Sequence, residues 1–349
     1  MPARQRPVMA RLPSYKAGQR ADPGGHKLSS NENPYGPLPS VLAAVMASAA
    51  GMNRYPDPHS VDLVAALAER LQVAPDWITV GCGSVAVCEQ VVSAVAGHGD
   101  EVIFPWPSFE AYPIITGVAG ATPVPVPLAA GFRQDLDAAA AAVSPATRCI
   151  FVCTPNNPTG TIATRAEVDR LLARVPDDVL VVIDEAYTEF VDDSEAVNGM
   201  DLVVDHPHVA VLRTFSKAYG LAGLRVGYAV AHPEVTEALR KTAIPFGVSV
   251  VAHDAALASL AAEDELLERV ARLRAERSRV HAALRAAGWE LPDSQGNFVW
   301  LPTGPRTADV VSALAGAGIV ARAFPGVGLR ITVADPVAND ALIACLTKF

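Results

Sequence analysis

A single lysine, Lys217, stands among small hydroxyl-bearing and glycine residues where an apolar run ends. The run Val209–Leu212 has the composition of a buried strand, and three glycines and Arg225 follow the lysine within ten residues. A lysine amine is a nucleophile only when unprotonated, and burial or a neighbouring cation lowers its pKa enough to allow this. We interpret Lys217 as a candidate covalent amine, not as an exposed lysine on a turn, because other segments of the chain complete the same site.

Two segments carry groups suited to a phosphate dianion. The turn that contains Gly83, Ser84 and Val85 is rich in glycine and joins an expected strand to an expected helix. Backbone N–H groups and the positive end of the helix dipole can approach an anion there, although such turns are common. Beside the lysine, hydroxyl and guanidinium groups come from Thr214, Ser216 and Arg225.

Polar residues also follow or interrupt three apolar strands. Asn157 lies in a loop between two prolines, and Asp184 and then Tyr187 follow the apolar run 179–183. A carboxylate at that position is costly to bury unless it pairs with a cation, which a protonated ring nitrogen would supply. Arg330 lies within another apolar run and needs an anionic partner, such as a substrate carboxylate. Phosphate, basic ring nitrogen and aldehyde together describe pyridoxal 5′-phosphate as the cofactor.

The elements that must position these residues alternate between short apolar strands and alanine-rich helices. Strands that are apolar at every position, such as 149–153 and 179–183, predict a mostly parallel sheet covered on both faces. Residues 1–30 lack periodic pattern and are expected to form an extended arm. From about residue 249 a long helical stretch, with a break near 263–264, leads into a smaller unit with short strands.

Composition excludes several classes of function. The 349 residues have a formal net charge of −9, which argues against a nucleic-acid-binding surface, and no apolar run is long enough to span a membrane. The five cysteines form no CxxC pair, which is typical of free thiols in a reducing cytoplasm. The histidine and carboxylate spacing predicts no metal site, and the N-terminus lacks the apolar segment of a signal peptide.

The chain resembles the fold-type I pyridoxal-phosphate aminotransferases, in the histidinol-phosphate aminotransferase family, from about Leu12 to its end. The motifs that carry this resemblance are Asn31–Pro37, Arg54–Asp57, Asn156–Gly160, Asp184–Tyr187 and Ser216–Arg225. It implies an α/β fold with a large domain, built on a mostly parallel seven-stranded sheet covered by helices, and a smaller α+β C-terminal domain. We expect an N-terminal arm over residues 1–40, the large cofactor-binding domain over 41–248 and the small domain over 249–349.

The resemblance also implies roles for individual residues. Lys217 would hold the cofactor as a Schiff base, Asp184 would pair with the pyridine nitrogen, and Asn157 and Tyr187 would bond the ring hydroxyl oxygen. Phe109 would stack on the ring where the family more often has tyrosine. The phosphate would be bound by Gly83, Ser84, Val85, Thr214, Ser216 and Arg225. Tyr55 would reach the cofactor of a second subunit, which makes a homodimer the expected assembly.

The resemblance limits the substrate as well. Arg330 would bind the α-carboxylate, and Tyr15 and Arg322 would line the side-chain pocket. The turn at Gly83 and the residues after Arg330 resemble the aromatic amino acid (phenylalanine) aminotransferase branch. We therefore expect transamination of phenylalanine, tyrosine or tryptophan with 2-oxoglutarate in the cytoplasm. The alternatives are a histidinol-phosphate aminotransferase, a phosphothreonine-type decarboxylase and a regulatory module that binds the cofactor.

Overall fold

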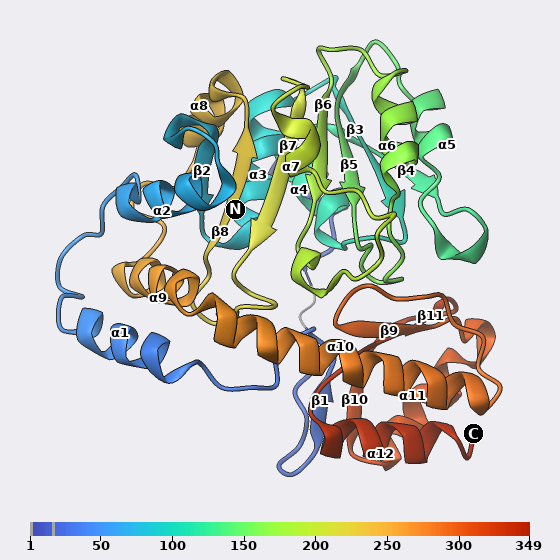
Figure 1. The fold of residues 1–349 in the computed structure, drawn as a ribbon. Helices are drawn as coiled ribbons and strands as arrows, with labels where there is room; N and C mark the ends of the chain where they lie inside the picture. Colours follow the sequence, from blue (N-terminus) through green and yellow to red (C-terminus); the bar gives the residue numbers. More distant parts are fainter. Residues whose placement is uncertain (1–2, 16–17) are drawn as a thin grey trace.

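The computed structural model describes residues 3–15 and 18–349, and a seven-stranded sheet forms the centre of the larger part (Figure 1). Its strands in spatial order are β2 (Ile78–Gly81), β8 (Gly227–Ala231), β7 (Val209–Thr214), β6 (Leu180–Asp184), β5 (Thr147–Cys153), β3 (Glu101–Trp106) and β4 (Thr122–Pro127). Only β8 runs antiparallel to its neighbours among these strands, so the predicted mostly parallel sheet is confirmed.

The continuous apolar strands are buried on both faces of this sheet. In β6, Val182 packs in a cluster with helices α3 and α4, whereas Val181 and Ile183 pack on the opposite side with α6. Both faces of the sheet are therefore covered at β6, and every residue of this strand is buried. The helices of the large domain are α1 (Pro39–Ala49), α2 (Val61–Leu71), α3 (Gly83–Val95), α4 (Ala111–Ala119), α5 (Leu136–Ala141), α6 (Arg165–Leu172), α7 (Met200–Val203), α8 (Pro233–Thr242) and α9 (Val250–Ala261).

A four-stranded sheet forms the core of the smaller part. Its order is β1 (His26–Leu28), β10 (Ile319–Phe324), β11 (Gly328–Thr332) and β9 (Phe298–Leu301). The helices of this part are α10 (Glu263–Ala286), α11 (Thr307–Gly316) and α12 (Pro336–Leu346). Figure 1 shows α10 running from the large sheet to the small one, with the helical break at residue 262 close to where the sequence predicts it.

Two elements cross the domain boundaries expected from sequence. Strand β1 lies within the segment expected as an arm, yet it pairs with β10 in the small sheet. Helix α9 lies beyond residue 249, yet its alanines pack in a cluster with α2 and β2. The boundaries at 40 and 248 remain a prediction, and this packing favours a division near the start of α10.

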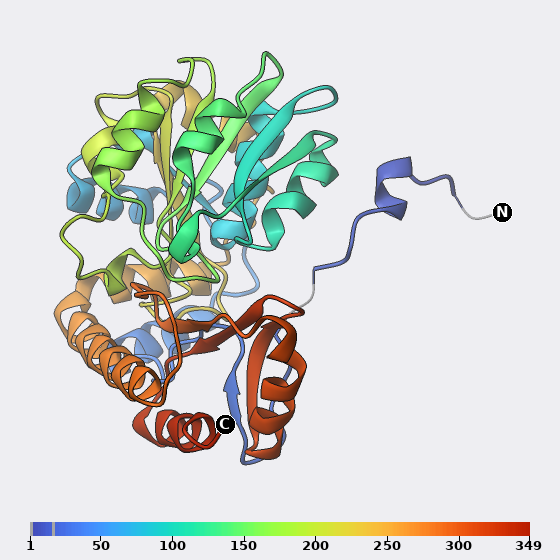
Figure 2. The same ribbon diagram turned by 90° about the vertical axis from the view of Figure 1, so that its right-hand side faces the viewer.

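The segment before β1 is not uniformly extended. A short 3₁₀-helix, η1, covers Pro7–Ala10, and Arg6 Nη2 donates a hydrogen bond to the carbonyl oxygen of Val118 at the end of α4 (2.6 Å). Figure 2 shows this segment leaving the small sheet and extending past the body of the molecule. The remaining 3₁₀-helices are η2 (Pro75–Trp77), η3 (Ala130–Phe132), η4 (Thr188–Phe190) and η5 (Gly304–Arg306).

Candidate active site

A cavity of about 280 Å³ lies where the carboxyl ends of β5, β6 and β7 face the small sheet. Ligands bind in open α/β sheets at this edge, because the loops that follow parallel strands meet there. Most residues predicted for the site line this one cavity: Tyr15, Ser84, Val85, Phe109, Asn157, Asp184, Tyr187, Thr214, Ser216, Lys217, Arg225, Arg322 and Arg330. The structure therefore brings together side chains that are more than 300 residues apart in the sequence.

Lys217 is half-buried and points its amine into this cavity. Its Nζ donates a hydrogen bond to the carbonyl oxygen of Ser30 (3.1 Å), two residues after the end of β1. Burial, and then the positive charge of Arg330, lower the pKa of the Lys217 amine from 10.5 to about 7. A large fraction of the amine is therefore neutral and nucleophilic near neutral pH.

Asp184, the last residue of β6, is only 4% exposed. Its Oδ2 accepts a hydrogen bond from the Tyr112 hydroxyl (2.5 Å), and its Oδ1 accepts one from the backbone N–H of Ala186 (3.3 Å). Burial raises the pKa of the carboxyl group from 3.8 to about 6, although both hydrogen bonds lower it. Across residues 3–15 and 18–349, no Lys, Arg or His pairs with this carboxylate, so a bound cation would stabilise it.

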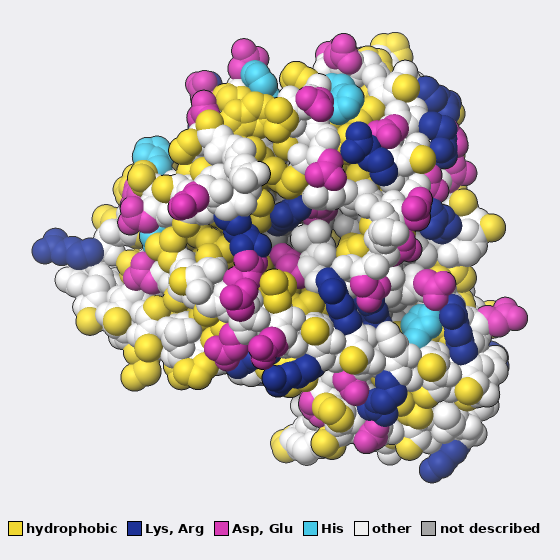
Figure 3. All heavy atoms as spheres, viewed as in Figure 1, with side chains coloured by type: hydrophobic (Ala, Val, Ile, Leu, Met, Phe, Trp, Pro, Cys, Tyr) yellow, Lys and Arg dark blue, Asp and Glu magenta, His cyan; other side chains and the backbone are white. Residues whose placement is uncertain are grey.

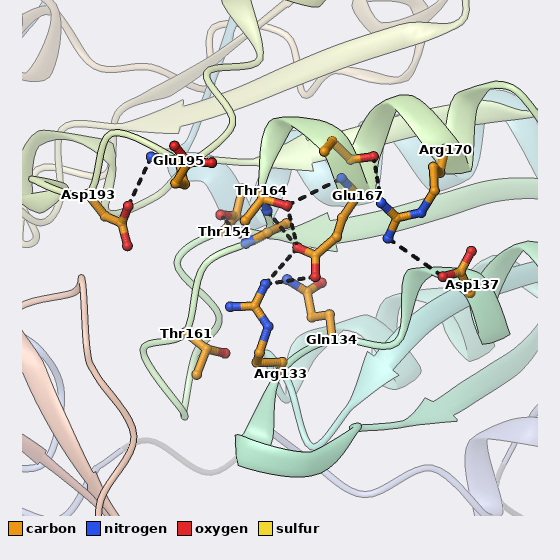
Figure 4. Close-up of polar contacts among 12 residues, drawn as sticks. Arg133, Gln134, Asp137, Thr154, Thr161, Thr164, Glu167, Arg170, Asp193 and Glu195 are labelled. Carbon is orange, nitrogen blue, oxygen red and sulfur yellow. Dashed lines mark hydrogen bonds and ion pairs between the residues drawn. The ribbon is translucent and has the colours of Figure 1, made fainter.

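Asn157 is held by the loop that follows β5, and this loop is fixed from outside the cavity. Gln134 exchanges two hydrogen bonds with the backbone of Cys153, and Thr154 Oγ1 accepts one from Ala163 N (3.0 Å). Figure 4 shows the polar residues that surround this loop, including the Arg133–Glu167 ion pair beside the first turn of α6. The loop is thus braced on the side away from the ligand, which restricts the position of the Asn157 amide.

The opposite end of the cavity collects groups suited to an anion. Arg225 Nη1 donates to the Ser216 hydroxyl oxygen (3.2 Å) and, in the part of the chain that is described, forms no ion pair with a carboxylate. Helix α3 begins at Gly83 without a side-chain cap, so its first N–H groups remain available. Gly83 has a φ of +79°, and a Cβ there would collide with the Arg225 guanidinium group. Only glycine therefore allows this approach.

Arg330 lies in β11 on the small-domain side of the cavity and is buried. Its Nη1 donates to Asn157 Oδ1 (2.6 Å) and its Nη2 donates to the Ser29 carbonyl oxygen (2.7 Å), whereas its Nε has no hydrogen-bond partner among the residues that the structure describes. Both partners are neutral, so the full positive charge remains for an anionic ligand. Burying such a cation is unfavourable without that ligand.

Tyr187 is fixed by a residue whose role the sequence does not reveal. Asn31 Nδ2 donates to the Tyr187 hydroxyl oxygen (3.0 Å), and Asn31 is itself held by Thr332 and Asn297 of the small domain. Asn31 has a φ of +53°, a left-handed conformation that asparagine tolerates better than most residues. Asn31 belongs to the motif Asn31–Pro37 that the sequence reveals, but the sequence does not reveal its contact with Tyr187.

Two predicted residues do not line the cavity of the single chain. Gly83 lies just behind it against Arg225, as described above. Tyr55 is 83% exposed and stacks on Phe246, with ring centroids 4.7 Å apart. Its predicted contact with the cofactor of a second subunit remains a prediction.

Two further residues that contact the site were not predicted from the sequence. Tyr112 lies in an apolar helix that is typical of a core, yet its hydroxyl group donates to Asp184. Glu110 precedes the same helix and forms an ion pair with Arg322. Neither contact has a local sequence signal, because both partners lie on distant segments.

Comparison with known proteins identifies the family. The family model "Aminotransferase class I and II" matches residues 24–345. The chain belongs to the class I and II aminotransferases. This aminotransferase is 56% identical to the aromatic amino acid aminotransferase of Streptomyces avermitilis, an alignment that covers 97% of the chain and 95% of the relative. It is 54% identical to the enzyme of the same name from Rhodococcus jostii, over 100% of the chain and 96% of the relative.

A solved structure with the same fold contains the predicted cofactor. The histidinol-phosphate aminotransferase of Sinorhizobium meliloti, in complex with pyridoxal 5′-phosphate, superimposes with a TM-score of 0.90 at 30% identity, covering 100% of this chain and 98% of that one. The fold-type I prediction is therefore confirmed, and the family is dependent on this cofactor.

The residues of the cavity fit pyridoxal 5′-phosphate. Among the described residues, Asp184 is a buried carboxylate that pairs with no cation and Arg225 is a cation that pairs with no carboxylate, whereas Lys217 is an amine whose pKa is lowered to about 7. A ring nitrogen, a phosphate and an aldehyde are their respective chemical complements. By contrast, no group of three or more metal-ligating side chains occurs in the described residues, and no helix among them is long and apolar enough to cross a membrane.

Proposed function

We propose that this aminotransferase transfers the amino group of phenylalanine, tyrosine or tryptophan to 2-oxoglutarate. The products are the aromatic 2-oxo acid and L-glutamate, formed in two half-reactions of a ping-pong mechanism. The observation that carries this proposal is an aromatic wall in the cavity, where the rings of Tyr15 and Phe109 meet edge to face with centroids 6.5 Å apart. An aromatic side chain gains both apolar burial and ring contacts against such a wall. The names of the Streptomyces and Rhodococcus relatives support the same substrate class.

Different residues of the cavity would bind different parts of the cofactor. When bound, pyridoxal phosphate supplies an electrophilic carbonyl group and an electron-withdrawing ring. Asp184 would hold the ring nitrogen in its positive form, and Arg225, with Thr214, Ser216 and the uncapped start of α3, would hold the phosphate. Phe109 would pack on one ring face. Asn157 and Tyr187 would fix the ring in its plane through the hydroxyl oxygen.

Lys217 and Arg330 would act on the amino acid itself. Arg330 would bind the α-carboxylate through its guanidinium fork, because its partners within the described chain are neutral. This contact would orient the Cα–H bond toward the catalytic lysine. Lys217 Nζ would then accept the proton from Cα and deliver it to the carbon derived from the cofactor aldehyde within the same half-reaction, which its lowered pKa favours.

A homodimer would complete the site. Large apolar side chains are exposed on α1, on the connection to α2 and on the loop before α9: Leu42, Met46, Met52, Tyr55, Ile244 and Phe246. Figure 3 shows hydrophobic side chains gathered over the region of α1. A patch of this kind in a water-soluble fold is typical of an interface. We infer that a second copy of the chain covers it and receives Tyr55 near its cofactor phosphate.

The discriminating experiment is a comparison of kcat/KM for phenylalanine and for histidinol phosphate, with 2-oxoglutarate as acceptor. Histidinol phosphate is the alternative because the Sinorhizobium structure bears that name. We expect phenylalanine to be the better donor. A preference of about 100-fold for histidinol phosphate, or about 2.7 kcal/mol in transition-state binding, would refute the proposal. Release of carbon dioxide without a keto acid would instead indicate the decarboxylase.

A further inference from the structure

Two arginines lie directly opposite each other at the small-domain side of the cavity. Arg322 in β10 and Arg330 in β11 are register partners in an antiparallel pair, and both line the cavity. Like charges at opposed positions of a sheet repel each other. The proximity of these two cations therefore requires a compensating negative charge, either from the protein or from a ligand.

The protein compensates only one of them. The Nε–Nη2 edge of Arg322 donates hydrogen bonds to the Glu110 carboxylate, with distances of 3.0 Å from Nε to Oε2 and 2.7 Å from Nη2 to each carboxylate oxygen. Arg330 is held instead by an amide oxygen and a carbonyl oxygen, and no carboxylate of the described residues pairs with it. One arginine is thus neutralised and the other keeps its charge for a ligand.

Glu110 also lines the cavity beside the aromatic wall formed by Tyr15 and Phe109. It follows Phe109 in the chain, and the rings of Phe109 and Tyr15 are in edge-to-face contact on one wall of the cavity. It is the N-cap residue of α4, at the end of the helix where the dipole favours a negative charge. The Glu110–Arg322 ion pair, which has no net charge, therefore lies beside the rings of Phe109 and Tyr15 at the end of the cavity that would receive the substrate side chain.

Resting on the proposed function, we infer that Glu110 determines specificity by competing with the substrate for Arg322. An aromatic side chain leaves the ion pair intact and meets a neutral end of the pocket. Glutamate and 2-oxoglutarate carry a second carboxylate, which competes with Glu110 for the Nε–Nη2 edge of Arg322. A side-chain phosphate faces the same obstacle. The enzyme would thus bind aromatic donors without rearrangement and dicarboxylates at the cost of breaking one ion pair.

The test is the variant Glu110→Gln, which keeps the shape of the side chain and removes its charge. We expect the ratio of kcat/KM for glutamate to that for phenylalanine to rise by about tenfold or more, equivalent to about 1.4 kcal/mol. A second readout avoids turnover: the Kd of glutarate should fall relative to the Kd of 3-phenylpropionate in calorimetric titrations of the holoenzyme. Asp137→Asn serves as control, because it removes the same charge from an exposed ion pair outside the cavity.

The same substitution in an Arg322→Met background tests whether the two residues act as a pair. Without the guanidinium group, the change at Glu110 should alter the ratio by less than about threefold, since no cation is released. A ratio that stays within about twofold of the wild type in Glu110→Gln, or a gain of equal size in both backgrounds, would overturn the inference. The wild-type donor preference is measured in the same series, so a failure of the proposed function is seen separately.

Discussion

Replacing Asp184 by asparagine should stabilise the cofactor-free protein while removing the partner of the ring nitrogen. The carboxyl group has an ordinary pKa of 3.8 and a pKa of about 6 in the folded chain, chiefly because it is buried. The folded protein therefore binds this proton more tightly than the unfolded chain does. The resulting penalty is absent below pH 3.8, grows as the pH rises toward about 6, and is fully present above it.

The size of the effect follows from the shift in pKa. At pH 7.5 the charged carboxylate costs about 3 kcal/mol of folding free energy, and at pH 5.0 about 1.5 kcal/mol. Asparagine keeps the oxygen that accepts the hydrogen bond from Tyr112 but loses the one from Ala186 N. This loss destabilises the variant by about 1 kcal/mol, which offsets part of the gain from removing the buried charge. We therefore expect Asp184→Asn to be more stable than the wild type by about 2 kcal/mol at pH 7.5 and by about 0.5 kcal/mol at pH 5.0.

The assay is denaturant-induced unfolding of the cofactor-free proteins at both pH values and at one protein concentration. Holding the concentration constant matters because dimerisation would change the apparent stability. The exposed Asp178 provides the matched control, since Asp178→Asn removes a charge that is not buried. If the stability difference between Asp184→Asn and the wild type is the same at both pH values, or if the variant is less stable at pH 7.5, the electrostatic account of this residue is wrong.

Three further predictions concern the lysine and the assembly. Lys217→Ala should lose both transamination and the visible absorbance of covalently held cofactor; persistence of that absorbance would mean that another lysine forms the bond. In the wild type, uptake of cofactor by the cofactor-free protein should be half-maximal near pH 7, where the Lys217 amine loses its proton. Co-expression of Lys217→Ala with Tyr55→Ala should restore about a quarter of the wild-type activity, because half of the dimers would be mixed and each would contain one intact site. Activity no higher than that of either variant alone would exclude a shared site.

The large sheet and its catalytic edge could be predicted from the sequence because their signals are local. Each central strand is a short run of apolar residues, and Asp184 and Lys217 come at or just after the ends of such runs. In a parallel sheet those ends share one edge, so the chemistry of the residues predicts a common site without any knowledge of the loops.

The parts that could not be predicted depend on contacts between distant segments. Strand β1 has only three residues and no periodic pattern, and its partner β10 lies nearly 300 residues further along the chain. The carbonyl oxygen of Ser30, which accepts a hydrogen bond from Lys217, was therefore not recognised. Glu110 looks like an ordinary acidic residue at the start of a helix, and only the fold brings it to Arg322.

The pairing of β1 with β10 has a consequence for the order in which the molecule is made. His26–Leu28 leave the ribosome long before Ile319–Ala321, with which they pair in register. Domains generally fold as units during synthesis, so the large sheet can form while this strand still has no partner. Ser29 and Ser30 therefore cannot be fixed against Arg330 and Lys217 until β10 and β11 have been translated. A nascent chain that stops before β10 would contain the lysine but not a finished site, and it could not begin catalysis until β10 and β11 are in place.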